Sequence, residues 1–337
     1  MNSTRELVCG GLQGLRCAGW APIWKRLPIV ALAALVGGYV EPPAAELAVE
    51  EVPLPPLRIQ GQPASAHTQG LEIVEGKYFV TARREDVVPK RALLLRTDLT
   101  ARKWDVWDIT PLDAQGGLTA LDHPGGLQSD GTRLWIPLAE SRRNGRSLLR
   151  AYRLEALTAG RSLKPELEFS VDDHIGALAV SVERGWLLGA NWDTEKVYVW
   201  NLEGQLQQIL TAPELRLREL GVQAGSAPRA GVAVQDWKLI GGQLCASGLY
   251  RSPGLPQALT ESRVLCFTNF LEAGFQQRTM KLPLHDGLQF AQEGMAISGD
   301  EILFLPEDLG ATNRMFRLSL DELAKRHVVD SPELGED

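Results

Sequence analysis

The chain has 337 residues, of which 44% are hydrophobic and 23% charged, a composition typical of globular proteins. Its formal net charge of −7 argues against nucleic acid as a partner, because phosphate binding requires a basic surface. No cluster of Lys and Arg marks a membrane-binding surface either.

Residues 1–45 have the features of an export signal or an N-terminal anchor. Lys25 and Arg26 precede an apolar stretch, residues 27–40, which is short for a membrane-spanning helix and has the length of a signal-peptide core. We therefore expect an exported protein, periplasmic or extracellular. It would touch a membrane only if the N-terminal segment stays uncleaved.

A short phrase recurs along the rest of the chain. His-x-x-[Gly/Ala]-Leu begins at His67, His123 and His174, and each copy precedes a strand-like apolar run. Weaker copies begin at Arg229 and Ala291. A spacing of fifty-odd residues indicates a repeat architecture.

Each repeat contains up to four strand-like segments. In the first repeat they are residues 70–74, 77–82, 92–98 and 103–109. The fifth repeat lacks an outer strand, which residues 52–59 can supply, because an edge strand tolerates their prolines. The sequence thus predicts an all-β, five-bladed β-propeller over residues 46–320 whose ring is closed by an N-terminal strand. Six blades are the alternative.

Two smaller features complete the expected architecture. Residues 319–328 predict a short helix. Most of it lies in the expected C-terminal tail, residues 321–337, which follows the propeller. Cys245 and Cys266 lie in neighbouring strand-like runs of the fourth repeat. They could form a disulfide in an exported protein or remain as two buried thiols.

In a propeller, the loop before each inner strand and the loop after each second strand open on the same face. Pockets favour such a mouth. The loops before the inner strands give the candidate ligand-binding residues His67, Gln69, His123, His174 and Arg229. The loops after the second strands add Asn191. Glu293 occupies the matching place in the fifth repeat.

The three repeated histidines are also a candidate metal site. Three imidazoles, from His67, His123 and His174, could hold a divalent ion such as Zn, Mn or Ca and leave a position open for water. Asp172 or Asp173 could orient the ring of His174 as a supporting carboxylate. The alternative is that a residue repeated in every blade serves the blade itself.

The loops after the second strands carry further polar side chains. They contribute Arg83, Arg84, Glu85, Asp86, Glu140, Ser141, Arg142, Arg143, Asn191, Trp192, Asp193, Glu307 and Asp308. Among these, Glu140, Asn191 and Glu307 end apolar strands, so we expect them in the pocket. Glu140, Glu293 and Glu307 are the candidate catalytic residues.

The segments HTQGL, HPGGLQSDGTRLWIPLAE, VDDHIGALAV and LLGANWDTEKVYVWN resemble an uncharacterised family of propeller-like proteins, a domain of unknown function. That resemblance implies the fold and no activity. Thr68 to Leu71 are similar to a T-Q-G-L phrase of the plant-type glutaminyl cyclases, which are five-bladed propellers. Those enzymes use a glutamate just before Gly-Leu in the next blade. Here that position is Gly125, and a Glu-Gly pair occurs instead at Glu293.

The expected function is binding of a small polar molecule or peptide by a monomeric, exported propeller at the mouth of its central channel. Three alternatives remain from the sequence. They are a metal- or carboxylate-assisted hydrolase of the lactonase or esterase type, a glutaminyl-cyclase-like acyltransferase, and a protein-interaction platform. An enzyme requires these side chains to converge on one point, whereas a platform requires exposed apolar side chains.

Overall fold

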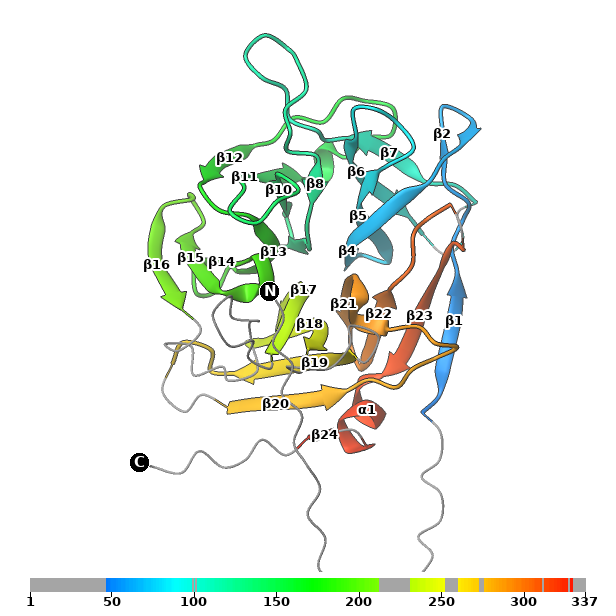
Figure 1. The fold of residues 1–337 in the computed structure, drawn as a ribbon, viewed down its shortest axis with the longest axis vertical. Coiled ribbons are helices and arrows are strands. Elements are labelled where there is room, and N and C mark those ends of the chain that lie inside the picture. Colours follow the sequence, from blue (N-terminus) through cyan, green and yellow to red (C-terminus); the bar gives the residue numbers. More distant parts are fainter. Residues whose placement is uncertain are drawn as a thin grey trace, which may run out of the picture. The chain divides into compact units, whose positions relative to one another are not determined.

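Five antiparallel sheets surround a common axis and form the blades of a β-propeller (Figure 1). The structure is a computed structural model that describes residues 47–98, 100, 102–211, 231–251, 260–272, 276–310, 312–326 and 328–329. Contacts divide the chain into Met1–Ala45 and Glu46–Asp337, and all five sheets belong to the second unit. The prediction of an all-β, five-bladed propeller is confirmed.

Blades one to three each run from an inner strand beside the axis to an outer strand at the rim (Figure 1). Blade one comprises β4 (Ala66–Val74), β5 (Lys77–Arg84), β6 (Arg91–Thr97) and β7 (Asp105–Asp108). Blade two comprises β8 (His123–Pro124) and β9 (Gln128–Ser129), both paired with β10 (Arg133–Ala139), then β11 (Ser147–Arg153) and β12 (Leu167–Val171). Blade three comprises β13 (Ile175–Ser181), β14 (Trp186–Asn191), β15 (Lys196–Asn201) and β16 (Leu206–Thr211). Short 3-10 turns, η1 (Leu154–Ala156) and η2 (Trp192–Thr194), follow β11 and β14.

Blades four and five each take a strand from a distant part of the chain. Blade four comprises β17 (Gly231–Ile240), β18 (Gln243–Arg251), β19 (Glu261–Thr268), β20 (Gln276–Lys281) and the tail strand β24 (Val328–Val329). Blade five comprises β21 (Gly294–Ser298), β22 (Glu301–Leu305), β23 (Arg314–Ser319) and β1 (Val49–Pro53). The 3-10 turn η4 (Phe290–Gln292) precedes β21, and α1 (Leu320–Arg326) is the predicted short helix.

The N-terminal strand closes the ring, as the sequence predicts, but with different bounds. Strand β1 ends at Pro53 instead of extending over residues 52–59, because the prolines that follow cannot donate to a ladder. Arg58–Ile59 (β2) instead pairs with Gln62–Pro63 (β3) in a separate hairpin.

The hydrophobic core consists of five clusters, one between each pair of neighbouring blades. Leu188 of blade three packs in one cluster with Trp237 of blade four, for example. Leu95 of blade one shares another with Leu303 of blade five, so the first and last blades are joined by apolar packing, as consecutive blades are. Apolar burial therefore stabilises the closed ring together with strand pairing.

The axis of the propeller is filled by its own inner strands, and this corrects the expectation of a central channel. The backbone N–H of Gly126 donates to Gly176 O at 2.9 Å, which joins the inner strands of blades two and three directly. A Cβ at Gly126 would lie 2.4 Å from Asp236 Oδ1, so only glycine permits this approach.

A fully buried ion pair stands at the centre of this filled axis. Asp236 Oδ2 accepts hydrogen bonds from the backbone N–H groups of Leu71, at 3.1 Å, and Met295, at 3.0 Å. Its Oδ1 lies 2.6 Å from Lys238 Nζ, which also donates to Leu127 O at 2.9 Å. One acid–base pair on blade four is thus bonded to the inner strands of blades one, two and five.

Cys245 and Cys266 lie directly opposite each other on β18 and β19 and form a disulfide. Within the described part of the chain, no helix has the length and apolar character needed to cross a bilayer.

Candidate functional site

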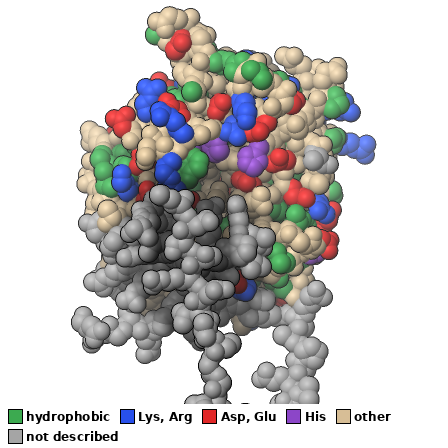
Figure 2. All heavy atoms as spheres, viewed as in Figure 1, with side chains coloured by type: hydrophobic (Ala, Val, Ile, Leu, Met, Phe, Trp, Pro, Cys, Tyr) green, Lys and Arg blue, Asp and Glu red, His purple; other side chains and the backbone are tan. Residues whose placement is uncertain are grey.

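The candidate site lies at one end of the axis, where loops before inner strands meet loops after second strands. Strand register places it there, because His67 on β4 lies opposite Arg83 on β5, and His123 on β8 lies opposite Ala139 on β10. Figure 2 shows histidine side chains at a hollow in this face, with acidic and basic side chains around them. We call this hollow the axial mouth and define it by His67, Gln69, Arg83, His123, His174 and Glu293.

His67 connects two carboxyl groups at the axial mouth. Its Nδ1 lies 2.7 Å from Oδ1 of Asp308, which follows β22. Its Nε2 lies 3.6 Å from Oε1 of Glu293. Gln69 Nε2 donates to Glu293 Oε2 at 3.4 Å, so the Glu293 carboxyl has an imidazole on one side and an amide on the other. Because a carboxylate accepts the Nδ1 proton, the neutral His67 ring carries its lone pair on Nε2.

Glu293 is a buried carboxyl group that favours its protonated form. Only 7% of the residue is exposed. Burial, together with the nearby charge of Asp308, raises the pKa of Glu293 well above its ordinary value, and Arg83 only partly opposes this. The site therefore holds a neutral carboxylic acid, which can donate a hydrogen bond or a proton.

Arg83 sets the tautomer of His123. Arg83 Nη1 donates to His123 Nδ1 at 3.1 Å and also contacts Ser141 Oγ. A guanidinium can only donate, so Nδ1 of His123 is the acceptor and its ring proton is on Nε2. Burial, then the positive charge that His174 and Arg83 can carry, lowers the pKa of His123 to about 3. This ring is neutral at physiological pH.

His174 has the opposite tautomer. Its Nδ1 lies 2.8 Å from the backbone carbonyl oxygen of Glu140 and must donate to it, so Nε2 of the neutral ring is an acceptor. Burial lowers the pKa of His174. The rings of His123 and His174 are 5.4 Å apart, and the Trp192 ring meets His174 edge-on at 4.7 Å. Two adjacent imidazoles thus differ in hydrogen-bonding role.

The two aspartates before this histidine do not orient its ring, which corrects the prediction made from their position. Asp173 Oδ1 accepts from the backbone N–H of His174 at 2.8 Å, and its Oδ2 accepts from Asn191 Nδ2 and Tyr198 OH. Asp172 is exposed. The ring is held instead by the backbone carbonyl, while Asp173 and Asn191 form a buried frame that fixes the loop.

Two of the three candidate catalytic carboxylates are occupied by arginines. Glu140 pairs with Arg142 at 2.6 Å and Arg146 at 3.1 Å. Burial raises the pKa of Glu140, but the hydrogen bonds from these arginines outweigh it and lower the pKa overall. Glu307 pairs with Arg314 at 2.5 Å. Both carboxyl groups are engaged in ion pairs, and of the three only Glu293 has a raised pKa.

The geometry gives no support to a metal site at the three histidines. The described residues contain no group of three or more His, Cys, Asp or Glu side chains arranged to hold a metal ion. The Nδ1 atoms of His67, His123 and His174 are each taken by a different protein group, and His67 turns toward Glu293. Arg229, the predicted fourth member of the axial set, lies outside the described residues.

The structure also identifies residues that the sequence did not single out. Arg83, Ser141 and Asp308 were expected only as members of polar loops, yet they contact the axial histidines directly. Asp236 and Lys238 were not anticipated. Charged residues that interrupt an apolar inner strand, as in VAVQDWKLI, are the signal that could have revealed them.

Comparison with known families gives one match. The model of DUF6454, a family of unknown function, matches residues 106–252, which is less than half of the chain. The expected resemblance to an uncharacterised family is confirmed over that segment, whereas the resemblance to glutaminyl cyclases is not shown. A search of curated proteins finds no significant match.

Solved structures resemble this chain at low sequence identity. A putative glycoside hydrolase from Parabacteroides distasonis is 12% identical, with 80% of this chain and 93% of that chain covered and a TM-score of 0.45. A protein of unknown function from Bacteroides thetaiotaomicron is 11% identical, with 81% and 76% covered and a TM-score of 0.43. A structure concerning the GH130 family of mannoside phosphorylases is 9% identical, with 87% and 98% covered and a TM-score of 0.47. Similarity at this level transfers no activity to the chain.

Proposed function

We propose that the axial mouth binds a small polar molecule. The observation that carries this proposal is Glu293, a buried carboxyl group with a raised pKa that faces an imidazole and an amide. Burying a polar group costs free energy unless it is hydrogen-bonded, so such a cluster is retained most readily where a ligand completes it. Perturbed carboxyl groups of this kind are concentrated at functional sites.

The hydrogen-bonding roles at the mouth favour a neutral or zwitterionic ligand with both donors and acceptors. The Glu293 acid and His123 Nε2–H offer protons, while the Nε2 lone pairs of His67 and His174 accept them. The charge of Arg83 is balanced by its ion pair with Glu85. A strongly anionic ligand would find little uncompensated positive charge here.

A second candidate function is general acid–base catalysis at the same mouth, in a hydrolase or acyltransferase. It is favoured by the contact of His67 with both Asp308 and Glu293. In a hydrolytic step, His67 Nε2 would take the proton of an attacking water while the Glu293 acid gives its proton to the leaving oxygen. In the cyclisation of an N-terminal glutamine, the α-amine would attack the side-chain amide carbon and give a proton to His67 Nε2. The Glu293 acid would protonate the amide nitrogen, which leaves as ammonia.

A ligand and substrate panel tests both proposals. Amino acids, monosaccharides, lactones, esters and N-terminal glutamine peptides are screened for a rise in Tm and for turnover. We expect a compound that stabilises the wild type to lose at least tenfold in affinity in His67→Asn and Glu293→Gln variants, since each removes one hydrogen-bonding role. Glu155→Gln, at an exposed side chain of blade two, is the control.

The outcomes distinguish a binding protein from an enzyme, and both of these from a protein in which the axial mouth has neither function. Binding without turnover supports a binding protein, and turnover lost with Glu293→Gln supports catalysis. Ligands that bind the two mouth variants as well as the wild type would contradict both proposals.

A further inference from the structure

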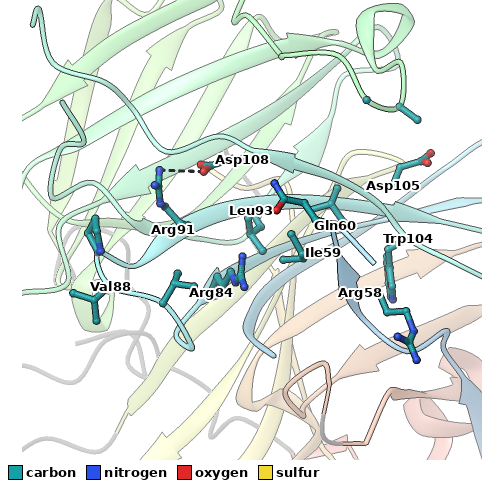
Figure 3. Close-up of a pocket in the computed structure, with 15 residues that line it drawn as sticks. Arg58, Ile59, Gln60, Arg84, Val88, Arg91, Leu93, Trp104, Asp105 and Asp108 are labelled. Carbon is teal, nitrogen blue, oxygen red and sulfur yellow. Dashed lines mark hydrogen bonds and ion pairs between the residues drawn. The ribbon is translucent and has the colours of Figure 1, made fainter. Parts of the chain in front are cut away.

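We propose a second binding site, lined by residues other than those of the axial mouth, for a small organic acid with an apolar body. It is a cavity of about 560 Å³ at the rim of blade one, beneath the β2–β3 hairpin. This volume lies within the range of small-molecule pockets. Figure 3 shows the cavity with its lining side chains from β2, β6 and β7 and from the loop that follows β5.

The floor and one end of the cavity are apolar. Leu93 belongs to the cluster between blades five and one, and Val106 from β7 and Ile59 from the hairpin pack against that cluster. Trp104 closes one end and is fixed there, because its indole N–H donates to Pro55 O at 2.7 Å. This surface would accept the hydrocarbon part of a ligand.

The rim of the cavity is basic. Arg58, Arg84 and Arg91 line it, against Asp105 and Asp108. Both aspartates already have arginine partners, since Asp105 is bound by Arg96, which lies outside the lining, and Asp108 by Arg91.

Arg58 is the cation that remains. It is exposed, donates to the backbone oxygen of Gly61 at 3.2 Å, and has no carboxylate partner among the described residues. Arg84 is neutralised by Asp86. A carboxylate entering the cavity would complete the charge balance and form charge-assisted hydrogen bonds with a guanidinium.

The conformation of Gln60 indicates that the β2–β3 hairpin takes part in ligand binding. Its φ of 52° lies in the left-handed region, where Gln is unfavourable and Asn or Gly is preferred in a two-residue hairpin turn. The exposed side chain lines the cavity, and in Figure 3 its amide is turned to the side on which Arg91 and Asp108 form their ion pair. Within the described part of the chain this amide forms no hydrogen bond. A strained residue that directs an unused polar group into a cavity points to a ligand.

The test uses benzoate and hexanoate as probes in isothermal titration calorimetry on the full-length chain. Benzyl alcohol is the uncharged analogue. We expect saturable binding of the two carboxylates and at least tenfold weaker binding of the alcohol. Arg58→Gln should weaken carboxylate binding at least tenfold, while Arg153→Gln, at another exposed arginine, should leave it unchanged.

Gln60→Asn provides a variant that cannot fail merely by misfolding. Asn is favoured at this φ, so the variant should be at least as stable as the wild type, yet its shorter amide should bind the carboxylates more weakly. Absence of saturable carboxylate binding would overturn the proposal. So would equal affinity in Arg58→Gln, or loss of binding in the mouth variants His67→Asn and Glu293→Gln, which would place the ligand at the axial mouth.

Discussion

Glu293 shows how one residue acquires its chemistry from neighbours that are distant in sequence. His67 and Gln69 come from blade one, and Asp308 from the loop after β22. Exclusion from water and the repulsion of Asp308 keep this carboxyl group protonated. The same glutamate on an exposed loop would be ionised at neutral pH.

The raised pKa of Glu293 predicts how the stability of the folded protein changes with pH. The folded-state pKa of Glu293 is raised, so the unfolded chain ionises first, and the folded state loses stability as pH rises above the ordinary value of 4.5. We expect Glu293→Gln to match the wild type at pH 4 and to be more stable at pH 7. The difference should grow by up to about 1.4 kcal/mol per pH unit until Glu293 itself ionises.

Urea unfolding of both proteins at several pH values measures this difference. The control is Glu155→Gln, because that carboxyl is 79% exposed and its removal should give no pH-dependent gain. A Glu293→Gln variant that is less stable than the wild type at pH 7 would show that the carboxyl is ionised in the folded protein.

At the scale of the elements, the inner strands are joined by polar groups as well as by apolar packing. Asp236 and Lys238 reach blades one, two and five from a single strand, β17. Glu72 lies near this pair, and burial raises its pKa to about 7 while Lys238 opposes the shift. The repeated glycines allow the strands to approach closely enough for these bonds.

We predict that removal of one partner of the buried ion pair strongly lowers the free energy of unfolding. Lys238→Met would remove the counter-ion of Asp236, a carboxyl at 0% exposure whose pKa burial already raises, and this should cost about 3–5 kcal/mol of unfolding free energy. The double variant Asp236→Asn/Lys238→Met should recover part of this loss, since no isolated charge remains. Chemical denaturation measures both.

The matched control is Lys281→Met, which breaks an ion pair with Glu261 at a half-exposed lysine and should change stability by less than about 1 kcal/mol. Equal effects of the two lysine substitutions would mean that the axial pair does not hold the inner strands together.

At the scale of the whole molecule, segments from both ends of the described chain add strands to blades formed elsewhere in the sequence. Strand β1 completes blade five, and β24 extends blade four. The disulfide between Cys245 and Cys266 adds a covalent link within blade four. Disulfides are typical of oxidising compartments, so this link supports our proposal that residues 1–45 direct export.

Export predicts a defined covalent state of the mature protein. Protein recovered from the periplasm of a bacterial host should lack the N-terminal segment and be lighter by two hydrogens because of the disulfide. Intact mass spectrometry before and after reduction measures both. Reduction should also lower the free energy of unfolding by about 3 kcal/mol, given a sequence separation of 21. A full-length chain with all four cysteines as free thiols would contradict the proposal.

The sequence by itself determined the architecture. Apolar alternation, turn residues and a recurrent His-x-x-[Gly/Ala]-Leu phrase are local properties, and they suffice to predict five blades, their strand order and the strand that closes the ring. They also predict which loops meet at the mouth, because strand direction follows from the repeat. The candidate residues His67, His123, His174 and Glu293 were found for this reason.

Only the tertiary structure decided what these residues can do. The sequence suggested a metal site, but each imidazole has a partner from another segment, and those partners fix three different environments. It also suggested Glu140 and Glu307, which are paired with arginines that follow them within seven residues. Protonation and pairing depend on burial and on charges brought together across blades. No local sequence pattern encodes the distances between side chains of different blades. The protonation and pairing of the site residues could therefore be assigned only from the tertiary structure.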